Sequence, residues 1–272
     1  MEVKFIKASP TENMTLLIET PVAREKQLAV AERLIAYGSV YAEQAGYIEE
    51  AENPAAEKRL QMMAGEFCGN ASLSLAAWLA KKKNLPIGEK TEITPEVSGA
   101  EQLVHCEMKR ETEHRFLGRV AMPLPQCIET RAFMLDDERI ELTAVVFAGI
   151  THILVPVSLW GENAAKKAER AARVWAKELP PVFGLLLFDE KEKSLKPLVV
   201  VEDVSLIWER GCGSGTSAVG AYLAAREKKD ITVSLKQPGG VMHATVSYQN
   251  GAVTKIEITG SVAIVAEGTA YL

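Results

Sequence analysis

The sequence predicts an α+β fold of two pseudo-symmetric halves, each a curved, mostly antiparallel sheet wrapped around a central helix. Three observations lead to this prediction. A Cys-Gly motif occurs twice, at Cys68 and at Cys212, and each copy opens a segment with helical character. The order of the expected strands and helices repeats around the two motifs. Both helical segments are small and apolar on most sides, as a helix buried among strands would be.

The two motif segments resemble each other beyond the cysteines. F-C-G-N-A-S-L-S-L-A-A-W-L-A contains Cys68, and G-C-G-S-G-T-S-A-V-G-A-Y-L-A contains Cys212. Aligned on Cys-Gly, they also share two alanines and a leucine, and Trp78 aligns with Tyr222. We interpret the repeat as an internal duplication that places one cysteine at the start of one helix in each half.

The first half is expected to follow the order strand, strand, helix, strand, strand, helix and then three strands. Alternating apolar residues indicate the strands, and apolar residues at helical spacing indicate the first helix. The expected strands are 3–7, 15–19, 39–49, 60–64, 91–97, 102–109 and 115–121, and the expected helices are 24–37 and about 68–83.

The second half is expected to repeat this order, with a charged amphipathic helix that stops before Pro180 and Pro181. The expected strands are 140–147, 152–157, 183–188, 198–201, 231–236, 242–248, 253–259, 261–266 and 269–271, and the expected helices are 162–179 and about 212–228. Pro123 and Pro125 interrupt the strand pattern between the halves. We therefore expect one domain over 1–125, joined by 262–272, and a second over 126–261.

Composition excludes several classes of protein. The chain has 272 residues, 47% hydrophobic and 25% charged, which is typical of a globular protein. A net charge of −5 argues against a nucleic-acid partner. The first residues lack the apolar core of a signal peptide, and the apolar stretches are too short to span a membrane. We expect a cytoplasmic protein without a membrane partner.

The four cysteines are widely spaced, which argues against a structural zinc site. Cys106 lies in an alternating strand pattern and Cys127 in a linker-like segment, and both are expected to be structural. The sequence shows no phosphate-binding loop and no dinucleotide-binding glycine motif, so no cofactor and no metal are expected. A pyridoxal lysine is left open.

The start of each cysteine helix has the residues of an anion site. Gly69 and Gly213 permit a tight entry into the helix, and Asn70 and Ser214 favour helix starts. Unpaired backbone N–H groups and the helix dipole would hold a carboxylate, and the same field would lower the pKa of a thiol. Each cysteine is therefore expected to be a low-pKa thiol beside a substrate anion.

Two such thiols on opposite faces of one carbon could invert it. A thiolate would remove the proton from one face, and the second thiol would return a proton to the other. Helix ends directed at the α-carboxylate would stabilise the developing negative charge. This reaction class needs no cofactor.

These residues resemble the diaminopimelate epimerase-like superfamily of cofactor-independent epimerases and racemases, over the whole chain. Cys68-Gly69-Asn70 matches the first catalytic motif and Cys212-Gly213-Ser214 the second. The resemblance implies that Cys68 and Cys212 are catalytic. It also implies that the substrate is an amino acid, bound by Asn13, Glu43, Gln44, Gly69, Asn70, Glu209, Gly213 and Ser214.

Departures from the pattern bear on the substrate. Only Gly211 separates Arg210 from Cys212, and Gly149-Ile150-Thr151-His152 replaces the G-N-P-H motif of diaminopimelate epimerases. The combination of G-E-F-C-G-N-A, I-W-E-x-x-C-G-S-G-T, Q-P-G-G and G-T-A-Y is most similar to the histidine racemases. The resemblance therefore implies interconversion of L- and D-histidine.

Several alternatives stay open. The protein could be a diaminopimelate or other amino-acid epimerase of the same fold, or a binding protein without turnover. An isomerase like the phenazine-biosynthesis type is disfavoured, because that type uses a carboxylate rather than paired thiols. His152, in an apolar strand, is expected to be structural. The accepted side chain, the resting thiolate, the downstream pathway and a homodimer are left open.

Overall fold

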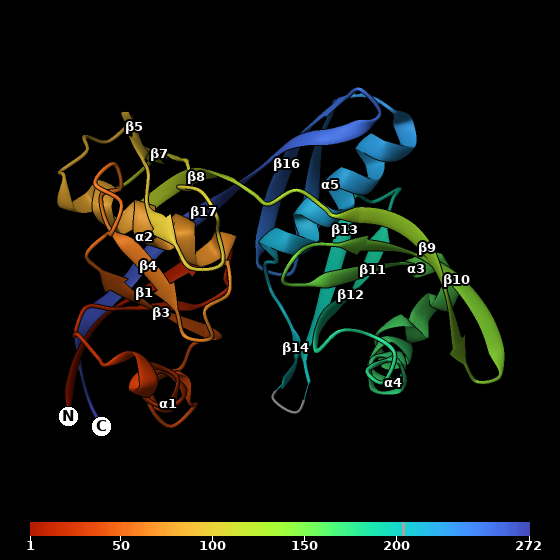
Figure 1. Ribbon diagram of the computed structural model, residues 1–272, viewed down its shortest axis with the longest axis horizontal. Coiled ribbons are helices and arrows are strands. Elements are labelled where there is room, and N and C mark those ends of the chain that lie inside the picture. Colours follow the sequence, from red (N-terminus) through yellow and green to blue (C-terminus); the bar gives the residue numbers. More distant parts are fainter. Residues whose placement is uncertain (203–204) are drawn as a thin grey trace. The chain divides into compact units, whose positions relative to one another are not determined.

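The computed structural model describes residues 1–202 and 205–272, and all structural statements refer to these residues. The chain forms two compact units of mixed α/β structure, rich in strands and with few helices (Figure 1). Unit 1 contains Met1–Met122 and Thr259–Leu272, and unit 2 contains Pro123–Ile258. Among the described helices, none is long and apolar enough to cross a membrane.

Unit 1 places most of its strands around one helix. Its elements are β1 (Glu2–Pro10), β2 (Thr15–Ile18), α1 (Arg24–Ile35), β3 (Gln44–Glu49), β4 (Arg59–Met62), α2 (Gly69–Lys82), β5 (Lys90–Ile93), β6 (Glu96–Val97), β7 (Cys106–Arg110) and β8 (Arg115–Ala121). β1 pairs antiparallel with β2 and with the last strand, β17 (Ala252–Tyr271). β2 and β3 run parallel, which requires the crossover through α1.

The helix α2 is the centre of unit 1, and nearly all its residues are buried. Strands β1, β2, β7 and β8 pack against it. Gly118 on β8 lies so close to the helix that a Cβ there would be 2.7 Å from a methyl group of Leu73. The expectation of a buried helix approached closely by strands is confirmed for this unit.

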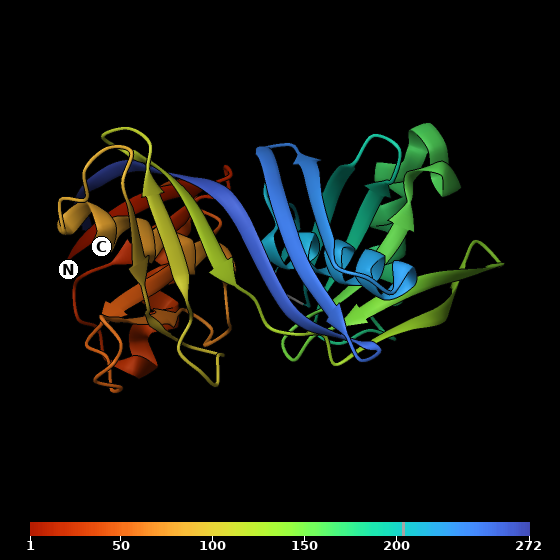
Figure 2. The same cartoon turned by 90° about the horizontal axis from the view of Figure 1, so that it is seen from above.

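Unit 2 contains a second buried helix. Its elements are β9 (Cys127–Leu135), β10 (Glu138–Val146), β11 (Thr151–Pro156), α3 (Val157–Trp160), η1 (Gly161–Asn163), α4 (Ala164–Trp175), β12 (Val182–Asp189), β13 (Ser194–Val201), β14 (Ser205–Trp208), α5 (Gly213–Glu227), β15 (Ile231–Gln237) and β16 (Gly240–Gln249). Figure 2 shows α5 alongside the blue strands β15 and β16. Gly220 permits this approach, because a Cβ there would be 2.8 Å from the Cβ of Ala244.

Some sequence-based boundaries were wrong. Cys127 lies in no linker: it is the exposed first residue of β9, which pairs with β10 as a ribbon. The strand was missed because its exposed positions carry no regular apolar alternation. The helix expected over 162–179 is shorter: η1 contains its first residues and α4 ends at Trp175, while the separate helix α3 ends before Gly161, whose φ is +57°. The expected strands 253–259, 261–266 and 269–271 form one strand, β17.

Trp175, at the end of α4, fills the core between α4 and the ribbon. Its ring lies 4.5 Å from that of Phe133, and its Nε1–H donates a 2.8 Å hydrogen bond to the carbonyl of Met134. We expect Trp175→Phe to lower the free energy of unfolding by about 1–3 kcal/mol, because the hydrogen bond to the Met134 carbonyl and part of a fully buried side chain are lost. Urea denaturation followed by circular dichroism measures this, with the exposed Val174→Ala as a control that should stay within about 0.5 kcal/mol.

Candidate functional site

Cys68 is the N-cap of α2. Its backbone is extended, with φ −136° and ψ 112°, and its sulfur accepts a 3.4 Å hydrogen bond from the N–H of Ala71. Asn70 lies in the first turn of α2, at the helix start as expected, and the cap itself is Cys68. The sulfur occupies the place of a capping oxygen, where backbone N–H groups are otherwise unpaired.

The residues around Cys68 form a hydrogen-bonded chain. Gln44 accepts the Cys68 S–H at 3.1 Å through Oε1, and its Nε2 donates to Asn13 Oδ1 at 2.7 Å and Thr15 Oγ1 at 2.9 Å. These two acceptors fix which way the amide points. Asn13 Nδ2 in turn donates to Glu43 Oε2 at 2.7 Å. The structure thus brings the predicted residues Asn13, Glu43 and Gln44 to Cys68, and adds Thr15, which sequence reasoning missed.

A tight loop supports the residues before Cys68. Gly99 has a φ of +71°, and a Cβ there would be 2.4 Å from the backbone nitrogen of Phe67. The neighbouring Ser98 hydroxyl donates to the carbonyl of Glu66 at 2.9 Å, and burial raises the pKa of the Glu66 carboxyl. The V-S-G-A sequence, with its glycine after a strand, was the only signal of this support.

Cys212 is the N-cap of α5 in the same way. Its backbone is extended, with φ −112° and ψ 110°, and its sulfur accepts a 3.3 Å hydrogen bond from the N–H of Gly215. The residue is 3% exposed. Ser214 lies in the first turn of α5, at the helix start, and the cap is again the cysteine.

The expectation of a low pKa was wrong for Cys212. Burial is the largest cause that raises the pKa of this thiol well above its usual range, and the adjacent Glu209 carboxylate, which hydrogen-bonds the thiol, raises it further. Ser214 and the Gly215 N–H lower the pKa, but only in part. The helix field acts as expected, yet desolvation and a neighbouring negative charge outweigh it.

Gln237 stabilises the loop that carries Cys212 through two hydrogen bonds. Its Oε1 accepts a 2.8 Å hydrogen bond from the Cys212 N–H, and its Nε2 donates to Thr216 Oγ1 at 2.7 Å. Thr216 Oγ1 donates back to the Cys212 carbonyl at 2.7 Å. Gln237 begins the Q-P-G-G turn, and this motif was its only sequence signal.

Ser214 connects Cys212 to His152. The Ser214 hydroxyl oxygen lies 3.4 Å from the Cys212 sulfur and 2.9 Å from His152 Nε2. His152 is fully buried, and burial lowers its pKa to about 3, so the ring is neutral at physiological pH. His152 was expected to be structural, and in the structure its buried ring also contacts Ser214, a predicted site residue.

The other two cysteines have different surroundings. Cys106 is buried in β7, and burial raises its pKa to about 12, so it is an inert thiol near neutral pH. Cys127 is exposed. Within residues 1–202 and 205–272 the four cysteines are thiols rather than members of a disulfide, and no group of three His, Cys, Asp or Glu side chains is arranged to hold a metal ion.

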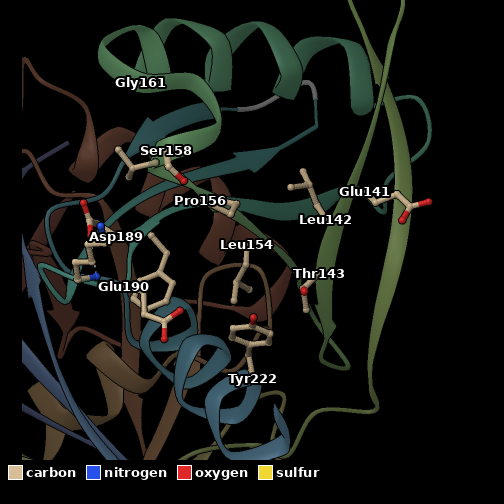
Figure 3. Close-up of a pocket in the computed structure, with 13 residues that line it drawn as sticks. Glu141, Leu142, Thr143, Leu154, Pro156, Ser158, Gly161, Asp189, Glu190 and Tyr222 are labelled. Carbon is tan, nitrogen blue, oxygen red and sulfur yellow. Dashed lines mark hydrogen bonds between the residues drawn. The ribbon is translucent and has the colours of Figure 1, made fainter. Parts of the chain in front are cut away.

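Unit 2 also contains a cavity of about 510 Å³, drawn in Figure 3. Residues of β10, β11, α3, η1, β12, the turn after β12 and α5 line it. Tyr222, late in α5, is among them, whereas Cys212 precedes the first turn of that helix. Glu190 is paired with Arg226 at 2.7 Å, and Asp189 accepts backbone N–H groups of its own turn. None of the predicted site residues lines this cavity.

Comparisons with known structures identify the fold. A probable proline racemase from Agrobacterium radiobacter superposes with a TM-score of 0.74 at 15% identity, covering 98% of this chain and 92% of that one. A hydroxyproline epimerase from Agrobacterium vitis gives 0.73 at 12% identity, with 99% and 91% covered. A PhzF-family phenazine biosynthesis protein from Bacillus anthracis gives 0.72 at 15% identity, with both chains fully covered.

Sequence comparisons identify the family. Residues 2–271 match the model of the histidine racemase CntK N-terminal domain. A histidine racemase from Fusobacterium nucleatum is 32% identical over 98% of this chain and 97% of its own length. One from Staphylococcus aureus is 29% identical, with 99% and 98% covered. The protein is therefore an isomerase of the amino-acid racemase type, and the chain belongs to the histidine racemase family.

Proposed function

We propose that the protein interconverts L- and D-histidine without a cofactor, using Cys68 and Cys212 as paired acid and base. One observation carries the proposal: both cysteines cap a buried helix and have a hydrogen-bond acceptor at the sulfur. Histidine as the substrate rests on the family and on the racemases from Fusobacterium and Staphylococcus that it resembles.

The reaction would proceed in two proton transfers. One thiolate takes the α-proton, so that the Cα–H bond breaks, an S–H bond forms and the electron pair stays on the α-carbon. The second thiol then gives its proton to the opposite face of that carbon. Backbone N–H groups at the helix starts, near Gly69, Asn70, Gly213 and Ser214, would bind the carboxylate and stabilise the charge that develops.

The surroundings of the two sulfurs support different starting roles. Glu209 accepts a hydrogen bond from the Cys212 thiol and raises its pKa in the free protein; once the substrate is bound, this carboxylate would take up the thiol proton, which would make Cys212 the base. The Gln44 amide cannot accept a proton from Cys68, so Cys68 would begin as the acid. For the reverse reaction the roles exchange.

Three further expectations belong to this proposal. The two units would be pseudo-symmetric products of a duplication, each with a curved sheet around its own helix, as in the diaminopimelate epimerase-like fold. Asn13, Glu43, Gln44 and Glu209 would contribute to substrate binding. A cytoplasmic location would keep both thiols reduced.

The test is the incubation of the purified protein with L-histidine in deuterated water, with no cofactor added. Chiral chromatography should show D-histidine, and mass spectrometry should show one deuterium at the α-carbon. L-Proline, diaminopimelate and a panel of other amino acids serve as comparisons. Turnover of another amino acid in place of histidine would refute the substrate, and binding without α-hydrogen exchange would refute the reaction.

A further inference from the structure

His152 occupies a site shaped for its ring. It lies in β11, directly across from Gly184 on β12 in the parallel register. A Cβ on Gly184 would be 2.4 Å from His152 Nδ1, so only glycine leaves room for the imidazole. Phe147 lies edge-on to the ring at 6.3 Å between centroids. The ring is thus held in one place by packing and is 0% exposed.

The surroundings of His152 determine which nitrogen carries the proton. In the described part of the chain, the buried Nδ1 has no hydrogen-bond partner, whereas Nε2 lies 2.9 Å from Ser214 Oγ. A buried N–H without an acceptor is rarer in proteins than an acceptor without a donor. The proton of the neutral ring is therefore on Nε2, and Nε2–H donates to Ser214.

This donation sets the direction of the next hydrogen bond. Ser214 Oγ accepts from His152 and has its own proton to give, and the Cys212 sulfur lies 3.4 Å away. With the reverse tautomer, the Ser214 proton would point to the ring and away from the sulfur. A hydroxyl proton directed at sulfur favours the thiolate, as does the N–H of Gly215.

We infer that His152 is a positioning residue for racemisation, which acts through Ser214 by directing the Ser214 hydroxyl proton at the Cys212 sulfur. This inference rests on the proposed role of Cys212 as the base that takes the α-proton. In this inference the Ser214 hydroxyl hydrogen-bonds the Cys212 sulfur, so only the Ser214 backbone N–H would be left to bind a substrate carboxylate. His152 itself touches no reacting atom.

The test compares His152→Leu, which removes the donor, with His152→Gln, which keeps an N–H near the position of Nε2. His152→Leu should lower kcat for histidine about 10- to 100-fold, the effect of one lost orienting hydrogen bond, with KM changed less than about twofold. His152→Gln should restore kcat to within about threefold of wild type. The rate of Cys212 alkylation by iodoacetamide at pH 8, followed by peptide mass spectrometry, should fall in parallel.

A second Ser–His pair in unit 2 provides a matched control. Ser234 Oγ and His243 Nδ1 lie 2.8 Å apart on β15 and β16, exposed to solvent, and His243→Leu should leave both kcat and Cys212 alkylation unchanged. Wild-type kcat and alkylation in His152→Leu, or equal losses in the Leu and Gln variants, would overturn the inference.

Ser214→Ala removes the same connection while keeping the ring, so the inference stays testable if His152→Leu fails to fold. Ser214→Ala should match His152→Leu, and the double variant should lose no more than either single one, because the two residues act in series. Additive losses would contradict a shared route. If the wild-type protein racemises nothing, the proposed function fails, but the alkylation rates still decide whether His152 acts on Cys212.

Discussion

Changing Cys68 or Cys212 to serine is expected to lower kcat for histidine racemisation about 10³-fold, within the range typical of a lost general acid or base. A serine hydroxyl is a far weaker acid than a thiol, so it neither yields an alkoxide base nor gives up its proton readily. Both single variants should lose inversion, because each transfer needs its own sulfur. Chiral chromatography of purified variants with L- and D-histidine measures the effect.

The chain supplies two matched controls for these variants. Cys127→Ser changes an exposed cysteine, and Cys106→Ser changes a buried one in β7. Both should keep kcat within about threefold of wild type, since neither side chain is part of the proposed chemistry. If Cys68→Ser or Cys212→Ser retained wild-type kcat, the paired-thiol mechanism would be wrong even though the family assignment would stand.

Glu209→Gln is expected to make Cys212 more acidic and faster to alkylate, and yet to lower kcat for racemisation. The Glu209 carboxylate raises the Cys212 pKa, so its removal should lower that pKa, although burial still holds it up. At any pH below the wild-type pKa, the thiolate fraction and hence the alkylation rate should rise. We nevertheless expect kcat to fall about 10²-fold, because the variant loses the group that accepts the Cys212 proton and gains a weaker sulfur base.

The two readouts therefore move in opposite directions for Glu209→Gln. Alkylation of Cys212 over a range of pH gives the pKa, and chiral chromatography gives kcat. Glu138→Gln, which changes an exposed carboxylate of β10, should alter neither. A slower alkylation in Glu209→Gln would show that the carboxylate does not oppose the thiolate, and an unchanged kcat would show that it is not the proton acceptor.

The sequence predicted the two buried helices and the place of each cysteine, because the Cys-Gly repeat and the small residues behind it are local signals. The family resemblance added Asn13, Glu43 and Gln44 near Cys68, but two partners of the Cys212 segment from elsewhere in the chain were not predicted. Gln237 contacts the Cys212 N–H from the end of β15, and His152 contacts Ser214 from β11. A lone histidine in an apolar strand shows no periodicity that would reveal such a contact.

The error in the Cys212 pKa has a similar origin. The helix dipole can be inferred from a loop-to-helix motif, but desolvation depends on how the whole unit packs. The thiol is 3% exposed because α5 is buried among strands, and Glu209 lies beside it from the preceding loop. Reasoning from the helix start alone included the helix field, which lowers the thiol pKa. It omitted desolvation and the Glu209 charge, which raise that pKa by more.

The pairing of β1 with β17 has a consequence for biosynthesis. Val3 lies opposite Ala270 and Ile6 opposite Glu267, so a strand that precedes unit 2 in the chain pairs with one that follows it. Unit 2 is contiguous in the chain and can fold while translation continues, whereas unit 1 must wait for residues 259–271. Until then, the edge of β1 that pairs with β17 has no partner.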